Sequence, residues 1–201
     1  MRRGRRSWLL WALLAALYLG FRLWYDGGGG PLTPAEVEHY VGRLEARGAD
    51  PARVAKLREF LASDTGSEFV MANFIHFTER PEAQQGLDRY MAHMYPALFQ
   101  RACHPVPAGP VVARALDHWG LDDGERWSMV GLVRYRSRRD IVEIATDPAF
   151  GDAHAFKVAA MAQTIAIPVE PFLLIASPRW LVGGALLGLG LALQLALGRR
   201  P

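Results

Sequence analysis

Asn73 and two arginines are polar residues that interrupt otherwise apolar, strand-like segments of this 201-residue chain. The amide of Asn73 must find hydrogen-bond partners inside a sheet, so it either binds a ligand or bonds to a neighbouring loop or strand end. Arg134 and Arg136 lie two residues apart, which predicts one shared strand face where their guanidinium groups would hold a carboxylate or phosphate. The alternative is that they form salt bridges with Asp140, Glu143 or an acidic loop.

The histidines form no recognisable metal or nucleophile motif. No two of the six have the i, i+4 spacing of a helical metal site, and none makes an evident pair with a serine or cysteine as its base. His154 lies on the apolar face of a predicted helix and is the best single candidate, with a packed core histidine as the alternative. We expect Asn73, Tyr90, Arg134 and His154 to line a ligand pocket, with no metal and no cofactor.

Cys103 and Lys157 carry less weight in the sequence. Cys103 is the one cysteine, so it cannot form an intrachain disulfide, and we expect it to fill space in the interior. Lys157 is one of only two lysines, but the arginine-rich composition explains that scarcity better than catalysis does.

These side chains must be positioned by an α+β domain. A capping box at Thr33–Glu36 opens a helical hairpin over residues 33–63. Beyond it, hydrophobic periodicity predicts strands over 68–77, 111–116, 128–136 and 164–169, with helices over 86–101, 137–146 and 150–163. The order β-α-β-β-α-β is the split βαβ, ferredoxin-like arrangement. It has helices on one face of the sheet only, so the other face needs a cover.

Several short motifs in this segment occur in the order seen in a known family. They are Met71-Ala72-Asn73-Phe74, His104-Pro105-Val106, Val133 to Arg138 and Thr146-Asp147-Pro148. Residues 64–170 thereby resemble the DUF1330-like proteins of the dimeric α+β barrel superfamily, and the helical hairpin resembles an extension that some members carry.

The resemblance implies a homodimer in which two sheets face each other and close a barrel. It implies no reaction, because the family has no established activity and the superfamily spans oxygenases, isomerases, haem enzymes and ligand-sensing modules. The alternative to a ligand-binding protein is therefore a cofactor-independent or haem-dependent oxidoreductase that uses the barrel pocket, with His154 as the candidate haem ligand.

The two ends of the chain predict membrane spans. Residues 7–25 contain one charge and reach about 28 Å as a helix, close to the thickness of a hydrocarbon core. A cleaved signal peptide is the alternative, but no small-x-small cleavage site follows the apolar run. Residues 180–197 contain no charge. Small residues recur every fourth position in both spans, including Gly20, Gly184 and Gly188, which predicts close helix packing within or between chains.

The charge distribution orients these spans. The net charge of +3 divides into +4 over residues 1–30, +3 over 171–201 and −4 between them. An acidic middle segment disfavours binding to nucleic acid. Four arginines precede the first span and two follow the last, against one at each inner flank. The positive-inside rule therefore places both termini in the cytoplasm and the domain outside it, in the inner membrane of a bacterium.

The predicted organisation follows from these boundaries. It runs as a cytoplasmic N-terminus (1–6), a transmembrane helix (7–25), a Gly-rich linker (26–32), the helical hairpin (33–63), the DUF1330-like domain (64–170), a linker (171–179), a transmembrane helix (180–197) and a cytoplasmic tail (198–201). The expected partners are the lipid bilayer, a second copy of the chain and a small apolar or anionic ligand.

Overall fold

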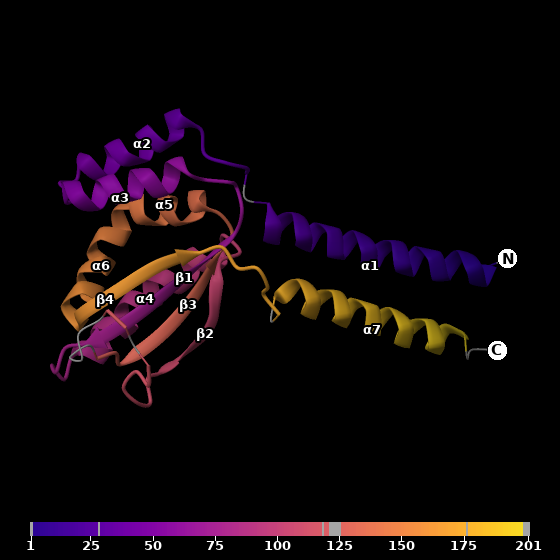
Figure 1. Cartoon of the computed structure of the whole chain (residues 1–201). Coiled ribbons are helices and arrows are strands. Elements are labelled where there is room, and N and C mark those ends of the chain that lie inside the picture. Colours follow the sequence, from indigo (N-terminus) through magenta and orange to yellow (C-terminus); the bar gives the residue numbers. More distant parts are fainter. Residues whose placement is uncertain (1, 28, 118, 121–125, 176, 199–201) are drawn as a thin grey trace. The chain divides into compact units, whose positions relative to one another are not determined.

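The computed structural model describes residues 2–27, 29–117, 119–120, 126–175 and 177–198. The chain divides into two compact units, residues 28–171 and the two ends of the chain, which are described separately. The first unit contains α2 (Pro34–Glu45), α3 (Pro51–Ala62), β1 (Phe69–Phe77), α4 (Ala83–Phe99), β2 (His104–Pro110), β3 (Met129–Tyr135), α5 (Arg138–Thr146), α6 (Pro148–Ala160) and β4 (Met161–Val169), as Figure 1 shows.

Capping residues start α2, α3, α5 and α6, and the capping box lies where the sequence predicts it. The Thr33 hydroxyl accepts from the Glu36 amide while the Glu36 carboxylate accepts from the Thr33 amide, which completes a capping box. Asp50, Ser137 and Asp147 cap α3, α5 and α6 in the same way through their side-chain oxygens. These contacts are local in sequence, so the start of each helix is encoded within a few residues.

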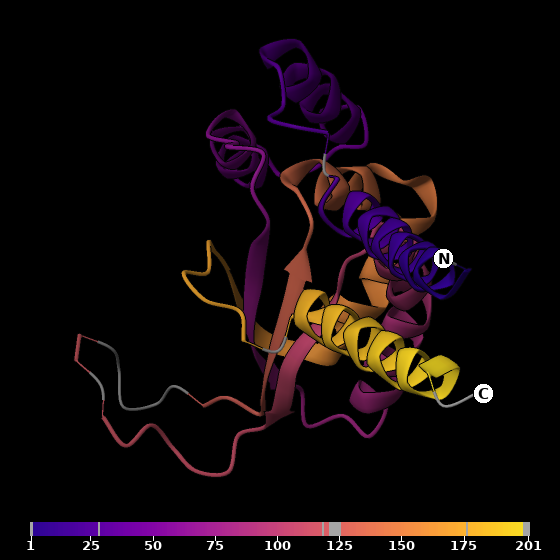
Figure 2. The same ribbon diagram turned by 90° about the vertical axis from the view of Figure 1, so that its right-hand side faces the viewer.

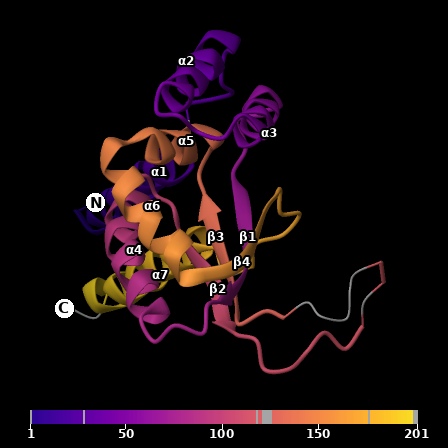
Figure 3. The same cartoon turned by 90° about the vertical axis from the view of Figure 1, so that its left-hand side faces the viewer.

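The four strands form one antiparallel sheet in the order β2-β3-β1-β4. This order and the β-α-β-β-α-β succession match the predicted α+β architecture. The helices α4 and α6 pack on each other and lie on one side of the sheet, as Figure 3 shows. Asn73 lies in the central strand β1, opposite Gly131 of β3 and Ala166 of β4.

The second strand was predicted in the wrong place. It comprises His104–Pro110, and no described residue of 111–117 is in a strand; Val112 and Leu116 are almost fully exposed. Prolines argue against a central strand because they lack a donor, but β2 is an edge strand with a register shift between Pro105 and Ala108, which tolerates them. The loop predicted around Asp122 to Gly124 lies outside the described residues.

The start of β4 is a smaller correction. Residues 161–163 were predicted to end a helix, but α6 stops at Ala160 and Met161 begins the strand opposite Phe77. Residues 161–163 pair with β1 across the sheet, and this pairing outweighs their helical hydrophobic periodicity. The register of β1 and β4 is irregular at this point, between His76 and Phe77.

The helical hairpin α2–α3 docks on the domain through its own apolar cluster and through Arg138. Val41, Val54 and Leu61 pack with Val142 of α5. The Arg138 guanidinium lies 4.6 Å from the Phe60 ring centroid, donates to the Phe60 carbonyl and to the Ser63 hydroxyl, and pairs with Glu170. The hairpin is therefore part of the same unit as the sheet, as a segment of its size requires.

The ends of the chain form a second unit of two antiparallel helices, α1 (Arg2–Asp26) and α7 (Pro178–Gly198), which Figure 2 shows side by side. The Trp11 indole donates to the Gln194 carbonyl at 2.7 Å, and the Arg179 Nε lies 2.7 Å from an Asp26 oxygen. Each helix contains a 20-residue segment long and apolar enough to cross a bilayer, with mean hydropathies of 1.4 and 1.9, a test of length and composition that a signal sequence also meets.

The small residues at the contact between these helices differ from the predicted stripe. Tyr18 packs against Gly183, and Trp11 packs against Gly190, seven residues further along α7. Gly20, Gly184 and Gly188 of the predicted every-fourth stripe have no atom within 4 Å of an added Cβ. Glycine is needed in α7 at the positions where the large aromatic side chains of α1 pack, so the spacing of these glycines is set by the aromatic residues of α1.

Candidate functional site

A cavity of about 1140 Å³ lies between the helix-covered face of the sheet and the helices of residues 28–171. Its walls come from every strand of the sheet and from α2 to α6, and they are mainly apolar. Methionine is prominent among them: Met71, Met91, Met94, Met129 and Met161. Methionine side chains are flexible and polarisable, so these walls can adapt to ligands of different shape. The volume is sufficient for a drug-sized molecule.

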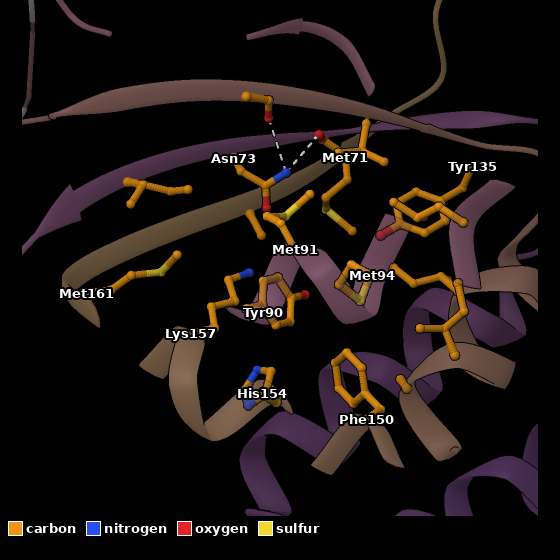
Figure 4. A pocket seen from close by; sticks show the side chains of 18 of the residues that line it. Met71, Asn73, Tyr90, Met91, Met94, Tyr135, Phe150, His154, Lys157 and Met161 are labelled. Atoms are coloured by element: carbon orange, nitrogen blue, oxygen red, sulfur yellow. Dashed lines mark hydrogen bonds between the residues drawn. The ribbon is translucent and has the colours of Figure 1, made fainter. Parts of the chain in front are cut away.

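Asn73 faces this cavity with its side-chain oxygen. Its amide nitrogen donates to the carbonyls of Met71 and Gly131, each at 3.1 Å. The alternation of side chains along β1 turns Met71, Asn73 and Ile75 toward the helices, and the Asn73 oxygen points into the cavity in Figure 4. Because both donors of the amide serve the backbone, the orientation is defined and an acceptor remains for a ligand.

Two tyrosines enter the cavity from opposite elements, Tyr90 from α4 and Tyr135 from β3 (Figure 4). Burial raises the pKa of Tyr90 to about 12, and burial together with the nearby Tyr90 raises the pKa of Tyr135 further. Both are neutral hydroxyls at physiological pH. Their rings are fixed by aromatic neighbours, Tyr135 stacking on Phe69 at 5.2 Å and Tyr90 meeting the edge of Phe150 at 6.4 Å.

Lys157 and His154 contribute nitrogen groups from α6. The Lys157 Nζ lies 5.5 Å from the Tyr90 ring centroid, and burial, assisted by the Arg53 charge, lowers its pKa. Burial also lowers the pKa of His154 to about 4, with smaller contributions from Arg53 and Lys157. Within the described part of the chain, Lys157 forms no salt bridge. The lining carboxylate Asp88 accepts instead from Gln84 at 2.9 Å.

Arg134 is not among the residues that line the cavity, which corrects the predicted site. It has no exposed surface, and it donates to Glu68 and to the Ala102 carbonyl, each at 2.7 Å. Every second residue of β3 faces the cavity: Met129, Gly131, Val133 and Tyr135. Arg134 lies between two of them, so the alternation of side chains along a strand turns it to the opposite face. Arg136 lies beyond the end of β3 and pairs with Asp140, so the two arginines do not form an anion site.

The structure therefore brings together Asn73, Tyr90 and His154, and it adds two residues that the sequence analysis did not select, Lys157 and Tyr135. Lys157 follows His154 by three residues, which places both on one face of a helix and was a signal available from the sequence. The burial of Lys157 could not be inferred from the sequence, because Tyr90 and Arg53 belong to other helices. Among the described residues, no group of three His, Cys, Asp or Glu side chains could hold a metal ion.

Comparison with known proteins identifies a fold. No family model matches the chain, and no curated protein matches it. The protein RPA0582 of Rhodopseudomonas palustris, of unknown function, is 21% identical over 62% of this chain and 95% of its own, with a TM-score of 0.50. The structure of methylated RPA0582 gives 20% identity over 64% and 95%, with a TM-score of 0.53.

A more distant match is a dimeric protein of unknown function with a ferredoxin-like fold from Bacteroides fragilis NCTC 9343. It is 12% identical over 54% of this chain and 99% of its own, with a TM-score of 0.33. At such identities the likeness to RPA0582 concerns architecture. Together with the strand order, it shows that the chain contains an α+β domain of the ferredoxin-like type.

Proposed function

We propose that this chain is a membrane-anchored ligand-binding protein whose cavity takes a small molecule with an apolar body and one anionic group. The observation that carries the proposal is the amine of Lys157, which lies in a mainly apolar cavity and forms no salt bridge within the described residues. Lys157 is partly buried, and a partly buried cation without a counter-charge is costly, so an anionic ligand that supplies one gains free energy there.

The other polar groups of the cavity fit the same class of ligand. Arg53 adds a second positive charge at the cavity, and the Tyr90 hydroxyl can donate to an anion. The Asn73 oxygen, in contrast, accepts, and it would select a ligand that also carries a hydroxyl or amide donor. Apolar walls with a few fixed polar groups are typical of small-molecule sites.

Ligands of one shape and different charge test this proposal. The full chain in phosphatidylcholine nanodiscs is titrated with 4-phenylbutyrate, 4-phenylbutanol and 4-phenylbutylamine by calorimetry, with empty nanodiscs as the blank. We expect the acid to bind about tenfold more tightly than the alcohol, since a charge-assisted hydrogen bond contributes roughly 1.5 to 3 kcal/mol. Lys157→Met should remove this preference, and Arg58→Met, on α3 among Glu38 and Glu45, should not.

Equal affinities for the three probes, or a preference that survives in Lys157→Met, would contradict the anion site. The same samples address the oxidoreductase alternative. A Soret band in the visible spectrum of the purified chain, lost in His154→Ala, would favour a haem protein over a ligand-binding module.

We further propose that the domain resembles DUF1330-like proteins in quaternary structure and works as a homodimer. On the face of the sheet opposite α4 and α6, the β4 residues Ile165, Ile167 and Val169 are apolar and are 42%, 47% and 46% exposed. Within residues 28–171 no described helix covers this face (Figure 3). Two such sheets stacked face to face would remove these side chains from water.

Crosslinking in membranes tests the dimer. Ile167→Cys should give a disulfide-linked dimer on oxidation, because the native Cys103 is fully buried and does not compete. The matched control is Val112→Cys, which is exposed but lies outside the sheet. A dimer yield from Ile167→Cys no higher than that of the control would leave the sheet face without its proposed partner.

The membrane topology is part of the same proposal. Arginines outside both apolar helices favour cytoplasmic termini and an extracytoplasmic domain. A reporter joined after residue 30 should be active when it is alkaline phosphatase and inactive when it is a fluorescent protein that folds only in the cytoplasm. The reverse result would place the domain in the cytoplasm.

A further inference from the structure

We propose that Lys157 is a nucleophile that forms an imine with an aldehyde or ketone group of a ligand held in the cavity. This inference rests on the proposed function in that it uses the same cavity. It goes further because it names a covalent bond and a class of reacting group. A carboxylate needs only the charge of a lysine, whereas a carbonyl needs its lone pair.

The surroundings of Lys157 favour the neutral amine. Figure 4 shows the side chain directed into the cavity, among Tyr90, Met91 and Met161. The charge that acts on Lys157 is that of Arg53 on α3, which disfavours the ammonium form. His154 on the same helix has a pKa of about 4 and is neutral at physiological pH. A lysine that is desolvated and close to another cation loses its proton at lower pH, which is how amine nucleophiles are activated.

The groups that face Lys157 from the other elements do not restore its proton. Tyr90 of α4 and Tyr135 of β3 are neutral, and Asn73 of β1 presents an amide oxygen. The carboxylate of Asp88, also on α4, is hydrogen-bonded to Gln84. Among the described residues, burial and the Arg53 charge lower the pKa of Lys157, and no described carboxylate acts in the opposite direction.

The reaction balances without an oxidant or reductant. The amine lone pair attacks the carbonyl carbon, a C–N bond forms, and the π electrons of the carbonyl move to its oxygen. Both protons of the amine then pass to this oxygen, which leaves as water while the C=N bond forms. The products are the imine and one water molecule, and the step is reversible, as it is for the Schiff bases that lysine forms in enzymes.

The chain provides its own control for the test, because Lys56 is the only other lysine. Lys56 is exposed on α3 and is also among the residues that line the cavity, so it reports how fast the probe reacts with an exposed amine of the same chain. The full chain in phosphatidylcholine nanodiscs, whose lipid has no primary amine, is treated at pH 7 with 3-phenylpropanal and cyanoborohydride. Reduction converts each imine into a stable secondary amine, and peptide mass mapping then locates it.

We expect Lys157 to be labelled about tenfold faster than Lys56, because the cavity holds the aldehyde beside Lys157 and because burial and the Arg53 charge lower the pKa of the Lys157 amine. The Lys157→Arg variant should lose this labelling while Cys103 stays protected from iodoacetamide, which shows that the domain is still folded. Labelling of Lys157 at or below the rate of Lys56 would overturn the inference.

The outcomes separate this inference from the proposed function. Binding of 4-phenylbutyrate without preferential labelling of Lys157 refutes the imine alone. Preferential labelling without a preference for the acid over the alcohol supports the imine and refutes the anion site. If neither effect is observed, both the imine and the anion site are refuted.

Discussion

Replacing Arg134 with methionine tests whether this residue stabilises the fold or binds the ligand. The guanidinium has no exposed surface, and its nitrogens lie 2.6 and 2.7 Å from Glu68 and 2.7 Å from the Ala102 carbonyl. The variant retains most of the side-chain volume but leaves the Glu68 carboxylate and the Ala102 oxygen without this partner. Removing one member of a buried ion pair costs about 3 to 5 kcal/mol.

The structure narrows this range. The Glu68 side chain is 21% exposed, so water can replace part of the lost interaction, and the expected loss in the free energy of unfolding is about 3 kcal/mol. In the double variant Arg134→Met with Glu68→Gln the charge is gone as well, and the loss should fall to about 1.5 kcal/mol. Guanidinium unfolding of the full chain in nanodiscs, followed by near-ultraviolet circular dichroism, measures both values.

The same variant also tests the correction of the predicted site. Because Arg134 lies on the face of the sheet opposite the cavity, folded Arg134→Met should bind 4-phenylbutyrate with unchanged affinity. A loss of stability below 1 kcal/mol would show that the pair is not the buried contact described here. A folded variant with weakened binding would return Arg134 to the ligand site and refute the assignment of faces.

Three further predictions concern single groups. The pKa of His154 should be about 4 by NMR titration. The unfolded chain then binds this proton at a higher pH than the folded chain does, so the free energy of unfolding falls as the pH decreases from 6.5 toward 4. A pKa of His154 near 6.5 would contradict its burial. Cys103 is fully buried, and burial raises the pKa of its thiol to about 12, so iodoacetamide should label it only after unfolding. Stoichiometric labelling of the folded chain would contradict this burial. Ala102 has a φ of 56°, so Ala102→Gly should stabilise the domain by about 0.5 kcal/mol in the same guanidinium assay, and destabilisation would argue against the left-handed conformation.

The sequence by itself determined the features that depend on neighbouring residues. Thr33, Asp50, Ser137 and Asp147 cap helices through side-chain oxygens that reach amides two or three residues away, so the helix starts could be predicted without a fold. The α+β order and the long apolar helices at both ends follow from periodicity and composition in the same way.

Only the tertiary structure decided which side chains share a space. The β2 strand was misplaced because its prolines are compatible only with an edge, and a strand becomes an edge only when the sheet is assembled. Arg134 was predicted to line the ligand pocket because neither its burial nor its pairing with Glu68, 66 residues away, is visible locally. Lys157 was set aside for the same reason: its surroundings come from α3 and α4, so its low pKa and its place in the cavity arise from packing between helices distant in sequence.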